Sequence, residues 1–334
     1  MRAAIYPGGG RPLVIAQLSD PQPGVGELLI RVHRCGVCGT DLAMTRGGQW
    51  DFPANGQLGH EYAGEVIDVG AHVEGFCVGN RIAVLPSEAC GHCRACDHGN
   101  NTLCGNAGGL MRGFAEYAVV PAAVSVRLPS VLSMADGALV EPLAVSLYGV
   151  RQSALQPGQN VLVLGGGTVA QLSIYWARQQ GAGRIVAMSR SASREALSLT
   201  MGADAFVPFG DQETAALADA MQGQAIDVVY ECVGVEGMLA RAVRHVAPFG
   251  RIVSLGFCTA PDPVIPALAS YKCATLQYVV GYTLGEFEYV ANHIDKGHVR
   301  PDTIVTRTAP LSDLPLVMNE LRQPNADTKV QIIC

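Results

Sequence analysis

The sequence lacks any long apolar run. Its apolar stretches are short and are interrupted by glycine, proline or charged residues, so no segment is expected to span a bilayer. The first ten residues also lack the apolar core of a signal peptide. We therefore expect a cytoplasmic protein that makes no use of a membrane.

Charge is equally sparse, and no block of like charge occurs. The chain has 23 basic and 29 acidic residues and a formal net charge of −6, so the positive surface of a nucleic-acid-binding protein is not expected. Charged residues make up 16% and apolar residues 49% of the chain, which leaves ample material for buried cores and little reason for disorder. A length of 334 residues is natural for two domains.

Two patterns of short elements divide the chain at about residue 145. Before it, strand-like runs alternate with turns, which is typical of an all-β, barrel-like domain; the runs are Leu28–Val32, Glu65–Val69, Arg81–Leu85 and Glu116–Val120. After it, strands and helices alternate, which predicts βαβ units and a parallel sheet. These segments are Val161–Leu164, Thr168–Gln180, Arg184–Met188, Ala192–Met201, Ile226–Glu231, Glu236–His245 and Arg251–Leu255. The tail predicts a helix and a final strand near Lys329–Ile333.

Eleven cysteines need an explanation other than disulfides in a reducing cytosol. Four of them, with the spacing C-x2-C-x2-C-x7-C, are Cys90, Cys93, Cys96 and Cys104. Four thiolates on one loop can surround a single Zn²⁺ and leave it no open position, which indicates a structural site. An iron–sulfur cluster and four unrelated cysteines are the alternatives. His92 and His98 are superfluous to a four-thiolate set and are expected in solvent.

A glycine-rich turn follows the predicted strand Val161–Leu164. Gly165, Gly167 and Ala170 fit the pattern G-x-G-x-x-A at the start of a helix. The first glycine permits the tight turn, and the second lets backbone N–H groups approach a pyrophosphate at the helix N-terminus. Within a βαβ unit, this motif predicts a dinucleotide site.

Four scattered residues carry little weight individually. A buried cysteine such as Cys38 is usually packing, and a pair such as His60 and Glu61 is more often structural than catalytic. Glu141 precedes a proline, as at many helix N-termini. Their order and spacing along the chain are more informative, because they belong to a series of short motifs. These motifs are Gly36-Val37-Cys38-Gly39-Thr40-Asp41, Gly59-His60-Glu61, the four-cysteine lobe, Gly113–Tyr117, Glu141–Val145, the turn at 165–167 and Glu231–Gly234.

Over essentially its whole length, the sequence resembles the zinc-containing medium-chain dehydrogenases, and best their sorbitol and threonine dehydrogenase branch. Glu141 stands where classical alcohol dehydrogenases carry a second cysteine ligand. The resemblance implies a GroES-like β-barrel catalytic domain (residues 1–145 and 288–334) with a zinc lobe at about 88–106. It also implies a Rossmann domain with a doubly wound parallel sheet (residues 146–287).

The resemblance further implies a catalytic zinc held by Cys38 and His60, with Glu61 as a direct or intermittent ligand and Glu141 as a ligand directly or through water. A catalytic zinc keeps an open position, where it acts as a Lewis acid toward an alcohol. Thr40 is the expected proton relay, although a turn-capping role is the alternative. Many relatives continue the relay through a histidine where this chain has Ala43. The substrate pocket is expected to include Ala43, Trp50 and Leu110, with plain core packing as the alternative for Trp50.

The end of the second Rossmann strand predicts a preference for NADP over NAD. NAD-binding folds place an acidic residue there to bind the ribose 2′-hydroxyl, whereas this chain has Ser189. Arg190 offers a planar fork to a 2′-phosphate, with Ser191 and Arg194 nearby. The alternative is that Arg190 lies over the adenine or in solvent. The remaining expected cofactor contacts are Gly165, Gly167, Thr168, Val169, Cys232 and Leu255.

Two function hypotheses follow. The favoured one is a dehydrogenase with two zinc ions per chain that moves a hydride between a secondary alcohol or polyol, or its ketone, and NADP. The other is a zinc-stabilised binding or structural protein on the same fold without catalysis. Relatives are commonly dimers or tetramers, so a homo-oligomer is expected.

Overall fold

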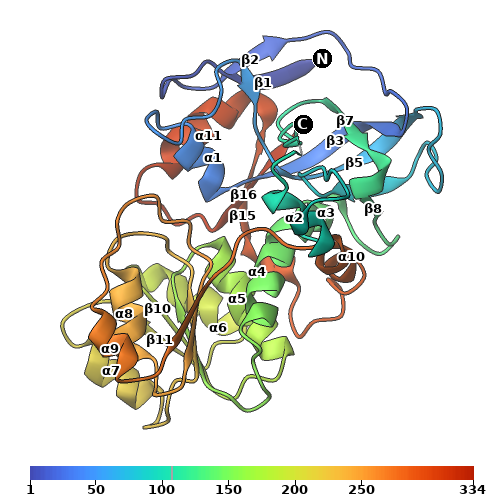
Figure 1. Cartoon of the computed structure of the whole chain (residues 1–334). Helices are drawn as coiled ribbons and strands as arrows, with labels where there is room; N and C mark the ends of the chain where they lie inside the picture. The colour runs from blue at the N-terminus through green and yellow to red at the C-terminus, as the bar shows by residue number, and fades with distance from the viewer. Residues whose placement is uncertain (107) are drawn as a thin grey trace. The chain divides into compact units, whose positions relative to one another are not determined.

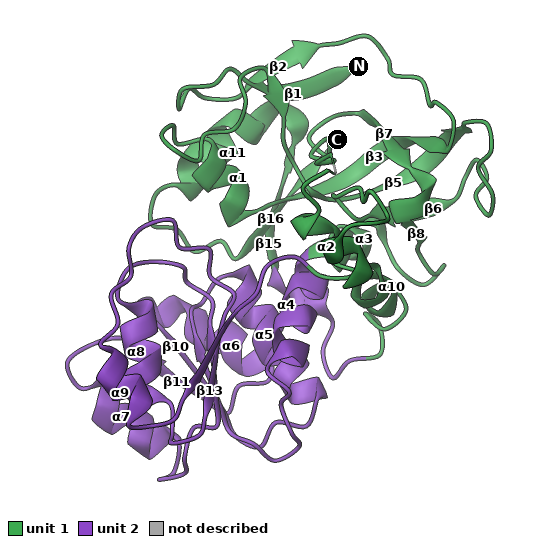
Figure 2. Cartoon of the chain, viewed as in Figure 1, with its two compact units in different colours: residues 1–141, 282–296, 305–334 green, residues 142–281, 297–304 purple. Residues whose placement is uncertain are grey.

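The structure, a computed structural model, describes residues 1–106 and 108–334 and divides them into two compact units (Figure 2). Unit 1 comprises Met1–Glu141, Tyr282–Lys296 and Val305–Cys334, and unit 2 comprises Pro142–Gly281 and Gly297–Ile304. Unit 1 is therefore assembled from three separate stretches of chain. No helix of the described residues is long and apolar enough to cross a membrane.

Unit 1 is mainly β-structure. Its seven-stranded sheet has the order β15-β16-β3-β5-β6-β8, with β7 pairing β3, and its small sheet has the order β2-β1-β4 (Figure 1). The strands are β1 (Arg2–Tyr6), β2 (Val14–Gln17), β3 (Glu27–Val37), β4 (Gly56–Gln57), β5 (Glu61–Val69), β6 (Arg81–Val84), β7 (Tyr117–Pro121), β8 (Ser125–Arg127), β15 (Val305–Pro310) and β16 (Lys329–Ile333). All pairs are antiparallel except β15 with β16.

Short helices connect these strands. They are α1 (Gly39–Met44), α2 (Arg94–Asp97), α3 (Met134–Gly137), α10 (Leu284–Ala291) and α11 (Leu314–Leu321), with 3-10 turns η1 (Asn101–Leu103), η2 (Ala122–Val124) and η5 (Leu311–Asp313). Helix α10 begins with a capping box between Thr283 and Glu286. Its buried residues Phe287, Val290 and Ala291 recur at helical spacing and anchor it in unit 1.

Unit 2 is built on a parallel six-stranded sheet with the order β11-β10-β9-β12-β13-β14. The strands are β9 (Val161–Leu164), β10 (Ile185–Ser189), β11 (Ala205–Pro208), β12 (Val228–Glu231), β13 (Arg251–Ser254) and β14 (Thr275–Tyr278). The helices are α4 (Val140–Gln152, mostly in unit 2), α5 (Thr168–Gln179), α6 (Glu195–Thr200), α7 (Glu213–Ala220), α8 (Met238–His245) and α9 (Pro266–Ser270), with 3-10 turns η3 (Ala192–Arg194) and η4 (Pro301–Ile304).

Helices cover both faces of this sheet, as Figure 2 shows for α7 and α8 on one side and α4 and α5 on the other. Leu162 and Leu164 of β9 join one core cluster with Leu217 of α7 and Val243 of α8. Side chains alternate across a strand, so the intervening positions, such as Val163, face away from that cluster. A doubly wound sheet follows, as the sequence predicted.

The predicted elements are present, with ends that differ by a few residues. Val161–Leu164 and Lys329–Ile333 coincide with β9 and β16, whereas the predicted helix 192–201 divides into η3 and α6. One tail segment differs in placement, since residues 297–304 pack with unit 2 rather than with the rest of the C-terminal stretch. The His298 ring stacks on Tyr175 of α5 with ring centroids 5.3 Å apart, which accounts for this placement.

Candidate metal and cofactor sites

The structure brings Cys38, His60 and Glu61 together, with potential ligand atoms within 4.8 Å of one another. Cys38 caps helix α1 directly after β3, and His60 directly precedes Glu61, the first residue of β5. Strands β3 and β5 pair antiparallel with Gly36 opposite Glu61, so the register sets the three donors side by side. Sulfur, imidazole and carboxylate are all ligands that zinc accepts, so the donor chemistry fits that metal.

Glycine is required at two positions around this cluster. A Cβ on Gly36 would lie 1.9 Å from Glu61 Oε2, which leaves no room for any side chain opposite Glu61. Gly59 has a φ of +88° directly before His60, a conformation that glycine adopts freely. The backbone thus shapes the site before any metal is considered.

Asp41 lies behind His60, a placement that the sequence did not reveal. Its carboxylate is fully buried, caps α1 by accepting from the Cys38 N–H, and lies 3.4 Å from His60 Nδ1. Burial opposes the charged imidazole, but Asp41 and Cys38 outweigh it and raise the pKa of His60 well above its ordinary value. A carboxylate behind a histidine fixes the ring for metal binding through its other nitrogen.

Lys329 is the second residue that the sequence did not reveal. Its Nζ, at the start of β16, donates to both carboxylate oxygens of Glu61 at 2.6 and 2.5 Å and to the Val37 carbonyl at 3.0 Å. Lys329 and Glu61 are 2% and 1% exposed, so each compensates the charge of the other in the interior. A carboxylate has about four lone-pair positions, so Glu61 keeps capacity for a metal beside this lysine.

Glu141 is buried near the donors but lies outside the compact group of three. Burial raises its pKa to about 7, Glu61 adds to the rise, and His60, Lys329 and Tyr282 oppose it. The Tyr282 hydroxyl donates to Glu141 Oε1 at 3.1 Å.

The expected relay residue Thr40 lies beside Cys38, whereas the expected pocket residues differ from one another in burial. The Thr40 N–H donates to Cys38 Sγ at 3.5 Å, and its hydroxyl lies 3.6 Å from the same sulfur. Ala43 is exposed and Trp50 is 51% exposed, so Trp50 is not a core residue of the chain. Leu110 is buried, and its carbonyl accepts from the Tyr62 hydroxyl at 3.1 Å.

The four lobe cysteines converge, as their spacing predicted. Sulfur–sulfur distances are 3.8 Å for Cys90 and Cys96, 3.6 Å for Cys93 and Cys96, and 3.8 Å for Cys93 and Cys104. Zinc–sulfur bonds of about 2.3 Å in a tetrahedron require separations of about 3.8 Å. Residues His92 and His98 are exposed, as expected.

The predicted cofactor contacts gather at the carboxyl edge of the unit 2 sheet, where parallel α/β folds bind ligands. They follow β9 (Gly165, Gly167, Thr168 and Val169), β10 (Ser189, Arg190, Ser191 and Arg194), β12 (Cys232) and β13 (Leu255). Gly165 has a φ of +130°, and Gly167 caps α5. The turn therefore has the backbone that an approaching pyrophosphate needs.

The segment after β10 is open to solvent and rich in donors. Ser189 Oγ donates to the Ser191 carbonyl at 3.2 Å, and Arg190 is exposed. Arg194 lies over the glycine-rich turn, because a Cβ on Gly166 would meet its Cγ at 2.6 Å. No carboxylate occupies the β10 terminus itself.

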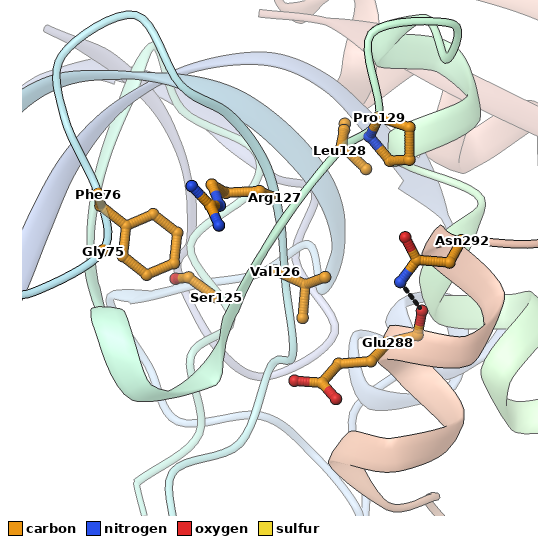
Figure 3. A pocket seen from close by; sticks show the side chains of 9 residues that line it. All are labelled: Gly75, Phe76, Ser125, Val126, Arg127, Leu128, Pro129, Glu288 and Asn292. Atoms are coloured by element: carbon orange, nitrogen blue, oxygen red, sulfur yellow. Dashed lines mark hydrogen bonds between the residues drawn. The ribbon is translucent and has the colours of Figure 1, made fainter.

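A separate groove of about 590 Å³ lies in unit 1, lined by the loop at Gly75 and Phe76, residues 125–129, Glu288 of α10 and Asn292 directly after this helix. Figure 3 shows the Glu288 and Asn292 side chains on the side of the groove opposite β8. None of its lining residues belongs to either donor cluster, so the groove is not part of the candidate site.

Comparison with known proteins identifies the family. Residues 24–130 match the alcohol dehydrogenase GroES-like domain, and residues 168–296 match the zinc-binding dehydrogenases. The chain is 32% identical to (R,R)-butanediol dehydrogenase of Bacillus subtilis over 90% of both chains. It is 33% identical to L-threonine 3-dehydrogenase of Pyrococcus horikoshii over 90% of this chain and 88% of that one. A zinc-binding dehydrogenase structure from Sinorhizobium meliloti, bound to NADP, has a TM-score of 0.89 at 28% identity and covers 100% of this chain and 99% of its own.

The chain therefore belongs to the zinc-containing medium-chain dehydrogenases, with a GroES-like domain and a Rossmann domain. It is an oxidoreductase of the branch that includes butanediol and threonine dehydrogenases, and the expected resemblance is confirmed. The comparisons do not support the alternative of a binding or structural protein that has this fold but no catalytic activity.

Proposed function

We propose that this chain oxidises a secondary alcohol or polyol, or reduces the corresponding ketone, with NADP(H) as the hydride carrier. The observation that carries this proposal is the convergence of Cys38, His60 and Glu61 in a member of the zinc dehydrogenases. The named activities of the butanediol and threonine dehydrogenases support a vicinally substituted secondary alcohol as the substrate class.

Two zinc ions per chain are part of the proposal. Cys38, His60 and Glu61 would hold the catalytic ion, with Glu141 beside it, and Cys90, Cys93, Cys96 and Cys104 the structural one. The sulfur–sulfur separations in the lobe match a tetrahedron around one zinc, which favours a single ion over an iron–sulfur cluster.

The residues around the catalytic cluster have distinct tasks. Bound zinc supplies a Lewis acid that lowers the pKa of the substrate hydroxyl. Asp41 orients His60, and Lys329 compensates the charge of Glu61. The Thr40 hydroxyl, 3.6 Å from Cys38 Sγ, accepts the substrate proton and passes it on. Because Ala43 carries no proton-accepting group, the relay continues from Thr40 through water.

The cofactor binds at the carboxyl edge of the unit 2 sheet. The glycine-rich turn and the N-terminus of α5 receive the pyrophosphate, while Ser189, Arg190, Ser191 and Arg194 receive the 2′-phosphate of NADP. The NADP found in the Sinorhizobium meliloti relative supports this assignment.

A cytoplasmic homo-oligomer is also proposed. Strand β14 forms an edge of the unit 2 sheet and exposes Leu276 and Tyr278 by 37% and 66%, and Val280 just beyond the strand is 42% exposed. An exposed apolar edge strand is a ready surface for pairing with a second copy. Light scattering of the purified chain tests this, and a monomeric mass at micromolar concentration would contradict it.

The test of the function combines zinc content with turnover against a panel of secondary alcohols and ketones. Cys38→Ser is expected to abolish turnover while the fold and the lobe zinc persist. Cys93→Ser is expected mainly to lower stability, because lobe zinc contributes folding free energy. Normal turnover in Cys38→Ser would refute the catalytic assignment.

A further inference from the structure

Tyr282 joins the catalytic cluster from a distant part of the chain. It is 3% exposed, and its hydroxyl donates to Glu141 Oε1 at 3.1 Å. Its ring stacks on Phe287 of α10 with centroids 5.8 Å apart and planes 11° from parallel. The ring and the hydroxyl are therefore held by different partners, and the hydroxyl fixes one oxygen of Glu141.

The neighbouring residue ties Tyr282 to the four-cysteine lobe. Thr283 forms an isolated antiparallel bridge with Asn100, which lies between Cys96 and Cys104. The contact is close, because a Cβ on Gly99 would lie 3.3 Å from Thr283 Cγ2. Thr283 also caps α10, and α10 packs on β8 (Figure 3).

These contacts form a continuous path of packed residues between the two metal sites. It runs from the cysteine loop through the Asn100–Thr283 bridge to Tyr282 and Glu141. A carboxylate oriented by a hydrogen bond presents its remaining lone pairs in a fixed direction. Loss of such an outer partner typically costs 10–100-fold in metal affinity or activity.

We propose that Tyr282 is a positioning residue for Glu141 at the catalytic metal site, and that the four-cysteine lobe holds Tyr282 in place through Thr283. The proposal rests on the proposed function for the identity of that metal. It assigns the lobe a task beyond stability, because the lobe sets the geometry of a carboxylate in the other site.

Tyr282→Phe tests the first half, since it removes the donor and keeps the ring that stacks on Phe287. We expect the Cys38 site of this variant to bind zinc with about 10–100-fold weaker affinity, measured by competition with a chelator. The zinc in the four-cysteine lobe should be retained. Tyr230→Phe is the matched control, because it removes a buried hydroxyl bonded to Ser153 at 2.8 Å in unit 2. It should leave both zinc affinities unchanged.

Gly99→Ala tests the second half without touching a thiolate. The added methyl meets Thr283, and the residue has a φ of +71°. Gly91→Ala is its control, since Gly91 lies in the same lobe with a φ of +77° and no atom within 4 Å of an added Cβ. Of these two variants, we expect only Gly99→Ala to weaken zinc binding at the Cys38 site. In a chain that already carries Tyr282→Phe, Gly99→Ala should cause little further loss of zinc affinity.

The outcomes separate this inference from the proposed function. Wild-type zinc affinity and turnover in Tyr282→Phe would overturn the role of Tyr282 and leave the dehydrogenase assignment standing. Equal effects of Gly99→Ala and Gly91→Ala would overturn the coupling. A wild-type chain that binds two zinc ions but turns over no alcohol would overturn the function, while the zinc affinities would still report on Tyr282.

Discussion

Thr40 illustrates how one residue serves the site through two groups. Its backbone N–H donates to Cys38 Sγ, and its hydroxyl lies beside the same sulfur. Thr40→Val keeps the first and removes the second. We expect unchanged zinc content and alcohol oxidation slowed by about 10²–10⁴-fold, the usual range for a lost acid–base participant. Steady-state kcat gives the measurement.

Thr200→Val is a suitable control for that experiment, because the Thr200 hydroxyl donates only to the Ala196 carbonyl on the exposed surface of α6. A near-normal kcat in Thr40→Val would show that the proton leaves by a route that avoids Thr40.

Cofactor choice is also decided by individual residues. Ser189 ends β10 without a negative charge, and exposed Arg190 follows it. We expect kcat/KM to favour NADP over NAD in the wild type and to reverse in Ser189→Asp/Arg190→Ala, because the new carboxylate binds the ribose hydroxyls and repels a 2′-phosphate. A tenfold wild-type preference for NAD, about 1.4 kcal/mol in the other direction, would refute the assignment.

Residues close in sequence were the predictable part of the candidate site. The lobe cysteines lie within fifteen positions, and Cys38 with His60 and Glu61 falls in short recognisable motifs. Lys329 and Tyr282 reach the site through tertiary contacts 268 and 141 residues away, which no local spacing encodes. Asp41 was visible next to Thr40, but its contact with His60 depends on the pairing of β3 with β5.

At the scale of elements, strands with a clear burial pattern were predictable. Val161–Leu164 is apolar throughout and coincides with β9. Strand β14 was missed, since its sequence Thr-Leu-Gln-Tyr is mostly exposed at a sheet edge and has no continuous apolar signature. Strand β11, of which only Val207 is buried, and helix α7 were missed as well.

The pairing of β3 with β5 yields a prediction of its own. Gly36→Ala places a methyl against the Glu61 carboxylate, and neither strand can move without disturbing the sheet. We expect loss of zinc at the Cys38 site, retention of lobe zinc and destabilisation of about 1–3 kcal/mol from overpacking. Zinc analysis and denaturant unfolding measure both effects.

Gly210→Ala provides the comparison, because an added Cβ there meets nothing within 4 Å and φ is not positive. It should leave zinc content and stability close to wild type. Full zinc content in Gly36→Ala would mean that Glu61 is not needed to hold the ion.

At the scale of the whole molecule, the two units differ in how the chain builds them. Unit 2 consists of one long segment and one short later segment of the chain, whereas unit 1 needs residues from both ends of the described chain. Among the described residues, every strand of the unit 2 sheet lies between residues 161 and 278 and pairs only with other strands of that interval.

The ion pair between Lys329 and Glu61 then has a consequence for synthesis on the ribosome. Until β16 has emerged, Glu61 has no buried cation, and an uncompensated carboxylate would be costly to enclose. We consider nascent chains that are stalled on the ribosome with residues up to 320 outside the exit tunnel. In these chains we expect unit 2 to resist protease, while β3 and β5 are still cleaved. Protection of both units at that length would contradict this order. Translation would thus finish the nucleotide-binding half first, and the donor cluster would close only when its last strand arrives.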